Sequence, residues 1–179
     1  MQTRNRLLVP VAALALVLAG SSAQARAQSR LSPHETVSAT VDGSDISITY
    51  GRPSMRGRAI MGALVPYGRV WCPGADEATT LAASRGLRIG GRTLAAGRYT
   101  LWMLPTADLW MLIINKQTGQ FHTQYDARQD LWRVDLEKRA LGSPVDQLTF
   151  TIVPRPGGGG VIKLAWETTE VSVPFTVSP

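Results

Sequence analysis

The chain has 179 residues, 44% of them hydrophobic, and a formal net charge of +6 at pH 7. These values are typical of one globular domain and exclude a disordered chain. Lysine and arginine form no basic block or aromatic-interleaved stripe, so the sequence does not predict a nucleic-acid partner. The single cysteine, Cys72, excludes an intramolecular disulfide and a cysteine-based zinc site.

The first 25 residues have the pattern of a cleavable secretory signal. Arg4 and Arg6 form a basic start. The uncharged run 7–20 that follows is shorter than the ~20 residues that a membrane-spanning helix needs. Two overlapping A-x-A sites then end at Ala25 and Ala27. We therefore expect cleavage near one of these alanines.

Segment 18–21 decides between a released and a tethered product. It reads Leu-Ala-Gly-Ser, with Ser21 where a bacterial lipobox requires the lipidated cysteine. A hydroxyl group cannot form the thioether link to lipid, so we expect no stable membrane anchor. The sequence thus predicts a periplasmic or secreted protein whose mature domain spans residues 28–179.

Apolar and polar residues alternate with period two along the mature chain, which predicts strands. Segments 37–41 and 46–50 flank the turn Asp42-Gly43-Ser44 and predict a hairpin with one buried face. The dense apolar runs 98–104 and 109–115 predict central strands that are covered on both sides. Further apolar or alternating segments lie at 87–89, 148–152, 162–166 and 171–177.

About nine short strands at this spacing predict an all-β fold, a single-domain antiparallel β-sandwich. Only Ile60 to Leu64 allows a single helical turn, and Pro154 to Gly160 predicts a loop.

Several motifs are more specific than this general β pattern. They are YGRPSMRGR at 50–58, LVPYGRVW at 64–71, GADEATT at 74–80, NKQTGQF at 115–121, QYD at 124–126, LAWE at 164–167 and VSVPF at 171–175. Together they resemble the bacterial family called domain of unknown function 2911, from about Val37 to Val177. The resemblance implies a small exported protein with no established activity. The chain departs from the family pattern at Cys72, Asp76 and His122, where the family often has arginine, asparagine and glycine.

Arg52, Arg56 and Arg58 cluster in a loop rich in glycine and proline. Guanidinium groups bind carboxylates and phosphates through paired hydrogen bonds, so this loop is a candidate site for an anionic ligand. The same side chains have a second interpretation, in which they pair with acids or loop carbonyls and brace a long connection.

Asp76, Glu77 and His122 are the weak candidates for catalysis, and together with Asp126 they are also candidate ligand-binding residues. His122 with Asp126 supplies the parts of a general base, and Asp76 and Glu77 are adjacent acids that face opposite ways if they lie on a strand. Each has a structural alternative: a solvated histidine or a surface ion pair. The sequence predicts no metal site and no cofactor, because His34 is the only other histidine.

Tyr67, Trp71 and Tyr125 complete the candidate ligand-binding residues. Exposed flat aromatic rings suit sugars, whereas buried rings fill sandwich interiors. Trp102, Trp110 and Trp166 lie in predicted strands, and we assign these three to the core. The assignment of Trp71 and Trp132 stays open.

Three functions remain open from the sequence. The leading hypothesis is a non-catalytic protein that binds a small ligand, a glycan or an envelope partner. The second is a small hydrolase that uses Glu77 or Asp76 with His122 and an arginine, which requires these groups to converge in one cavity. The third is a purely structural envelope protein.

Export is directly testable. We expect the protein from a bacterial periplasmic or secreted fraction to begin just after Ala25 or Ala27, as measured by intact mass. A product that keeps Met1 and stays inside the cell would contradict the prediction.

Overall fold

The computed structural model describes residues 32–178, which form nine strands and one short 3-10 helix. The elements are β1 (His34–Val41), β2 (Ser44–Gly51), β3 (Thr80–Ala83), β4 (Leu87–Ile89), β5 (Arg92–Leu94), β6 (Gly97–Pro105), β7 (Trp110–Asn115), η1 (Ala127–Gln129), β8 (Asp130–Pro154) and β9 (Gly160–Val177). No helix among these residues has the length and apolar character needed to span a membrane. The predicted all-β antiparallel fold is confirmed.

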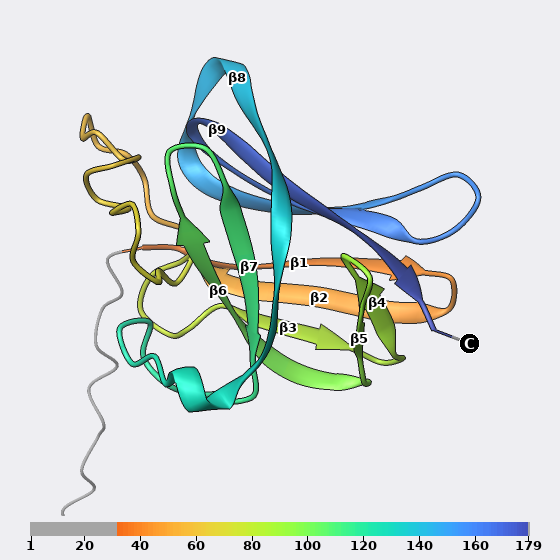
Figure 1. The fold of residues 1–179 in the computed structure, drawn as a ribbon. Helices are drawn as coiled ribbons and strands as arrows, with labels where there is room; N and C mark the ends of the chain where they lie inside the picture. The colour runs from red at the N-terminus through yellow and green to blue at the C-terminus, as the bar shows by residue number, and fades with distance from the viewer. Residues whose placement is uncertain (1–31, 179) are drawn as a thin grey trace, which may run out of the picture.

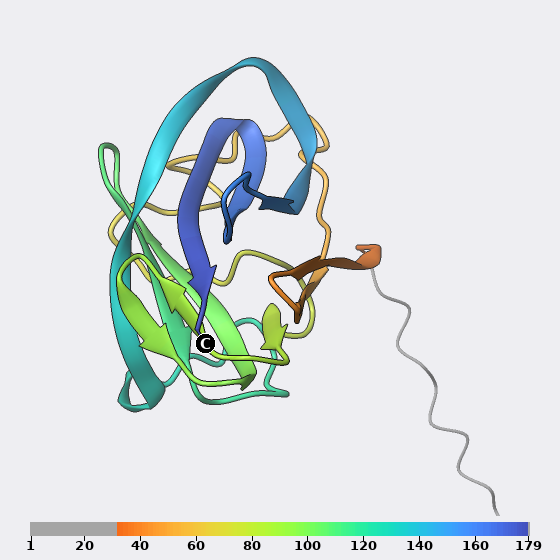
Figure 2. The same cartoon turned by 90° about the vertical axis from the view of Figure 1, so that its right-hand side faces the viewer.

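The nine strands form one sheet in the order β1-β2-β3-β6-β7-β8-β9-β4-β5. All the pairings between neighbours are antiparallel. Figures 1 and 2 show β8 as a long curved strand that arches over the molecule, with β9 inside the arch. The sheet is therefore bent into two facing parts that enclose a core.

β8 is the strand that joins the two parts. Its first residues, 130–136, pair with β7, and residues 137–154 pair with β9. The β8–β9 ladder shifts register twice between Ala140 and Thr149, and such irregularities bend a strand. The bend brings Phe150 against Tyr50 of β2, with ring centroids 5.0 Å apart and the Phe150 N–H donating to the Tyr50 hydroxyl at 3.1 Å.

The predicted first hairpin is confirmed. β1 and β2 pair throughout, and the turn residues Asp42 and Gly43 both have positive φ, 48° and 75°. Two positive φ values define the tight turn that matches the twist of a hairpin, and Asp-Gly is a favoured sequence for it. The alternation of β2 also has the predicted consequence, because Ile46, Ile48 and Tyr50 are all buried.

β6 and β7 are buried on both faces, as predicted. Leu101 and Met103 face the main core, whereas Trp102 and Ile113 belong to a second, smaller apolar cluster. Cys72 and Ala78 complete the buried part of that cluster, and they come from the connection between β2 and β3. This connection therefore folds down as a cover over the outer face. Residues 60–64 form turns and no helix.

Gly51 permits the cover to approach the sheet. A Cβ atom at Gly51 would overlap the main-chain carbonyl of Ala75. Gly51→Ala should therefore lower the free energy of unfolding by about 1–3 kcal/mol, as measured by urea denaturation. Gly142→Ala is the control, because a Cβ there meets nothing within 4 Å. Equal stability of the two variants would contradict the proposed close contact.

Candidate functional site

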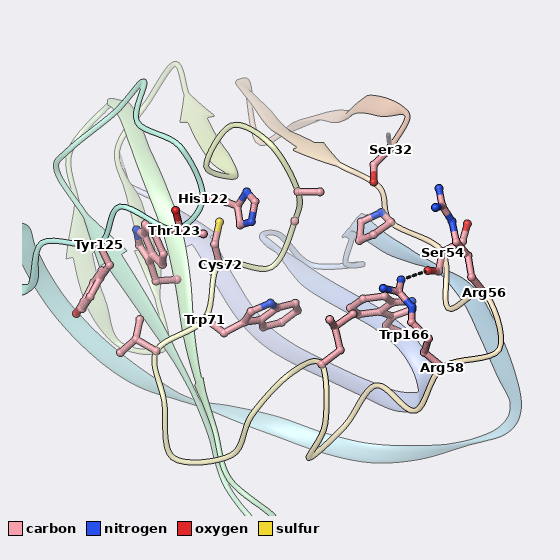
Figure 3. Close-up of a pocket in the computed structure, with 16 residues that line it drawn as sticks. Ser32, Ser54, Arg56, Arg58, Trp71, Cys72, His122, Thr123, Tyr125 and Trp166 are labelled. Atoms are coloured by element: carbon pink, nitrogen blue, oxygen red, sulfur yellow. Dashed lines mark hydrogen bonds between the residues drawn. The ribbon is translucent and has the colours of Figure 1, made fainter. Parts of the chain in front are cut away.

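The main cavity lies where the β2–β3 connection meets the β7–β8 connection, and its volume is about 530 Å³. It is lined by Ser32, by Pro53, Ser54, Arg56, Arg58 and Leu64 of the first half of the β2–β3 connection, by Val70, Trp71, Cys72, Gly74 and Ala75 of its second half, by His122, Thr123 and Tyr125, and by Trp102 and Trp166. Figure 3 shows these side chains around the hollow. Two sheet strands and two loops thus build the walls.

Indole rings form the apolar wall. Trp71 stacks on Trp166 with centroids 6.2 Å apart and an interplanar angle of 14°, and it meets Trp110 edge-on at 6.2 Å. The Trp166 indole N–H donates to the Asp146 carbonyl at 3.0 Å. Main-chain bonds in both directions between Trp71 and Met103, each 2.8 Å, hold Trp71 beside β6. Trp71 is half-buried, so its ring is set in position and still borders the cavity.

Arg52 is a brace. Its guanidinium donates to the Leu148 carbonyl at 3.1 Å, to Glu35 at 2.9 Å and to the Thr149 hydroxyl at 2.9 Å. These bonds tie β1, β8 and the start of the β2–β3 connection together. Arg52 does not appear among the described residues that line the cavity.

Arg56 and Arg58 have a different position, because both line the cavity and both are exposed. Arg58 donates to the Met55 carbonyl at 3.0 Å and, through Nη2, to the Ser54 carbonyl at 2.9 Å. These two bonds use two of its five N–H donors and orient the guanidinium. Arg56 has a positive φ of 50°, an uncommon conformation for a long side chain. Both side chains lie at one side of the hollow in Figure 3.

Arg56 and Arg58 lie in one stretch of the β2–β3 connection, which we call the arginine loop. Glu167 holds this loop on β9. Its Oε1 accepts a hydrogen bond from the Ile60 main-chain N–H at 3.0 Å, and Ile60 is fully buried. Glu167 has a φ of 53° and lies where the β8–β9 ladder is irregular. Strained backbone of this kind persists where the surroundings hold it in place.

His122 is held by the main chain of Asp76. The Asp76 carbonyl oxygen lies 2.9 Å from both the His122 main-chain nitrogen and His122 Nδ1. The Asp76 carboxylate is not among the described lining groups, and its Oδ2 is buried without a hydrogen-bond partner in residues 32–178. Glu77 Oε2 lies 2.7 Å from His34 Nε2. Neither acid borders the cavity that His122 lines, so the hydrolase alternative gains no support.

Tyr125 and Asp126 each form a hydrogen bond with a different residue nearby in the chain. The Tyr125 hydroxyl donates to Asp130 at 2.5 Å, and desolvation with this bond raises the pKa of Tyr125 to about 12. Asp126 pairs with Arg128 at 2.9 Å, and the hydrogen bonds from Arg128 lower the pKa of the Asp126 carboxyl. Asp126 therefore caps the short helix η1 and does not orient the His122 ring.

Of the ten candidate residues, the cavity brings together Arg56, Arg58, Trp71, His122 and Tyr125. Tyr67 is exposed, with its ring against Gly62. Sequence reasoning missed Trp102 and Trp166, which it assigned to the core. Both are buried, yet both also border the cavity. Only the folding of distant loops onto these strands reveals that second role.

The fold and the cavity define a small antiparallel β protein with an aromatic-walled hollow built by its loops. Within that class, the chain belongs to the family described as "Protein of unknown function (DUF2911)", whose model matches residues 32–175. This match confirms the resemblance seen in the sequence. Comparisons with curated proteins and with solved structures give no significant match.

Cys72 makes the stability of the protein sensitive to alkaline pH. Burial raises the pKa of the Cys72 thiol to about 11, above the value of 9.0 for a free thiol. Between these two values the unfolded chain loses the proton that the folded chain keeps, so stability falls as the pH rises. The loss should approach ~2–3 kcal/mol by pH 11.

Urea denaturation from pH 8 to pH 11 measures this loss. In Cys72→Ser, which has no thiol to titrate, the decline should be smaller by the same amount. Parallel curves for the two proteins would contradict a buried, neutral thiol.

Proposed function

We propose that this chain is an exported, non-catalytic protein that binds a small ligand with an apolar or ring-shaped body and an anionic group. The observation that carries the proposal is the composition of the cavity wall. Its described residues include three tryptophans, two arginines and a histidine, and no aspartate or glutamate. Such a wall favours negative charge and apolar surface in the same ligand.

The size of the cavity supports a small molecule. A volume of about 530 Å³ falls within the range typical of sites for small ligands. Hydrogen bonds hold the Trp166 indole and the Arg58 guanidinium in place. Side chains that are already ordered lose less entropy when a ligand binds.

The arginine loop supplies the anion site in this proposal. Arg58 keeps three N–H donors beyond its two loop bonds, and Arg56 borders the same hollow. Arginine suits carboxylates and phosphates because its planar fork matches their geometry. The half-buried Trp71 beside this loop suits a flat ring or the C–H face of a sugar. Aromatic acids and sugar acids share this chemistry.

Export forms the second part of the proposal. The leader pattern of residues 1–25 and the lack of a lipobox cysteine at Ser21 support a periplasmic or secreted location. The leader falls outside the described residues. A protein in that compartment meets small acids and glycans from the medium and from the envelope.

A thermal-shift screen on the purified full chain tests the binding proposal. The panel contains aromatic carboxylates, sugar acids, sugar phosphates, inorganic phosphate and the neutral sugars. A ring-bearing anion at 100 times its dissociation constant should add ~2.7 kcal/mol, which raises Tm by about 5–10 °C. Arg56→Gln/Arg58→Gln should bind that anion at least tenfold more weakly, because the paired hydrogen bonds are lost.

Arg88→Gln is the matched control. Arg88 is an exposed arginine on β4 and does not belong to the cavity wall. The Arg88→Gln variant should bind the anion as the wild type does. The proposal fails if neutral sugars bind as tightly as their acids, if the double variant keeps full affinity, or if no compound shifts Tm.

A further inference from the structure

The two hydrogen bonds to Asp76 determine which nitrogen of His122 carries the proton. A carbonyl oxygen can only accept, so the 2.9 Å contact with Nδ1 requires a proton on Nδ1. In a neutral imidazole the other nitrogen, Nε2, then has an unshared electron pair. Within residues 32–178 His122 Nε2 forms no hydrogen bond or ion pair, and the residue lines the cavity.

The backbone around Asp76 is built to hold this arrangement. Asp76 has a φ of 64°, a conformation that few residues other than glycine, asparagine and aspartate adopt. The Ala78 N–H donates to the Gln120 carbonyl at 2.9 Å, and Glu77 forms an antiparallel bridge with Phe121. The segment from Asp76 to Ala78 is thus paired with the segment that carries His122. Left-handed backbone beside a residue that lines a cavity is a reason to suspect a function.

The imidazole ring also has little freedom to turn. The Phe121 ring packs against it with centroids 4.5 Å apart and an angle of 41°. Figure 3 shows His122 at one side of the hollow and Arg56 and Arg58 at the other, with Trp71 and Trp166 between them. A hydrogen-bond acceptor and a cationic group therefore stand at opposite ends of an aromatic wall.

We propose that His122 is a specificity-determining residue that accepts a hydrogen bond, through Nε2, from a hydroxyl group of the ligand. The ligand class is then a hydroxy acid in which a ring separates the hydroxyl group from a carboxylate or phosphate. This inference rests on the proposed function, because the arginine loop holds the acid. Once a bound ligand covers the half-buried His122, Nε2 selects for such a hydroxyl, since a ligand without it leaves this acceptor unpaired.

The first experiment determines the tautomer of His122 in the absence of ligand. The chain has only two histidines, so nitrogen-15 NMR of the histidine-labelled full chain, with His34→Gln for assignment, resolves His122. At pH 8 we expect the proton on Nδ1. Asp76→Asn should keep this tautomer, because asparagine tolerates positive φ. Asp76→Val should lose it, because a β-branched residue does not. A proton on Nε2 in the wild type would overturn the inference.

The second experiment measures hydroxyl recognition with matched probes: benzoate against para-hydroxybenzoate, and phenylpropionate against its para-hydroxy form. Titration calorimetry should show about a 3–10-fold preference for one hydroxy acid over its partner in the wild type. His122→Phe should bind both members of that pair equally, and Asp76→Asn should keep the preference.

The outcomes separate the two proposals. If both acids of each pair bind the wild type equally, the role of His122 is overturned and the anion site stands. If the preference persists in a folded His122→Phe variant, another group recognises the hydroxyl of the ligand, and the inference is again overturned. If no acid, sugar acids and sugar phosphates included, binds the wild type, the proposed function fails, and this inference fails with it.

Discussion

The hydrogen bonds of β8 to two different neighbours hold this molecule together. One end of the strand pairs with β7 and the other with β9, so a single strand belongs to both facing parts of the sheet. The two parts enclose a continuous core whose residues run from Val41 to Phe175 in the chain. The bent β8 carries Phe150 against Tyr50 of β2, and its partner strand β9 carries Trp166, which stacks on Trp71. The aromatic wall of the cavity therefore depends on the same strand as the core.

The β2–β3 connection lines the cavity because polar groups hold it down at separate points. Arg52 bonds it to β8, and Glu167 of β9 accepts from Ile60. Ala75 rests against Gly51, where a larger residue would not fit. A long loop carries many main-chain donors and acceptors, and these contacts satisfy part of them within the fold. The same contacts leave Arg56 and Arg58 exposed at the edge of the cavity.

The charged residues of the sequence motifs thus serve two purposes. Arg52 and Asp126 form structural ion pairs, whereas Arg56, Arg58 and His122 border the hollow. Position in the fold decides the role, because a guanidinium surrounded by acceptors has fewer donors to offer a ligand. This division supports the binding role that we propose for the cavity. The acids of the hydrolase alternative do not line the cavity, and Glu77 lies against His34.

The sequence by itself determined the class of fold, the first hairpin and the double burial of β6 and β7, because alternation and apolar runs report burial along one strand. It also singled out five of the residues that line the cavity. Only the tertiary structure decided which arginine braces and which borders the hollow, how Asp76 orients His122, and that Trp166 joins the wall. These contacts join residues far apart in the chain, such as Arg52 with Leu148, and local periodicity carries no record of them.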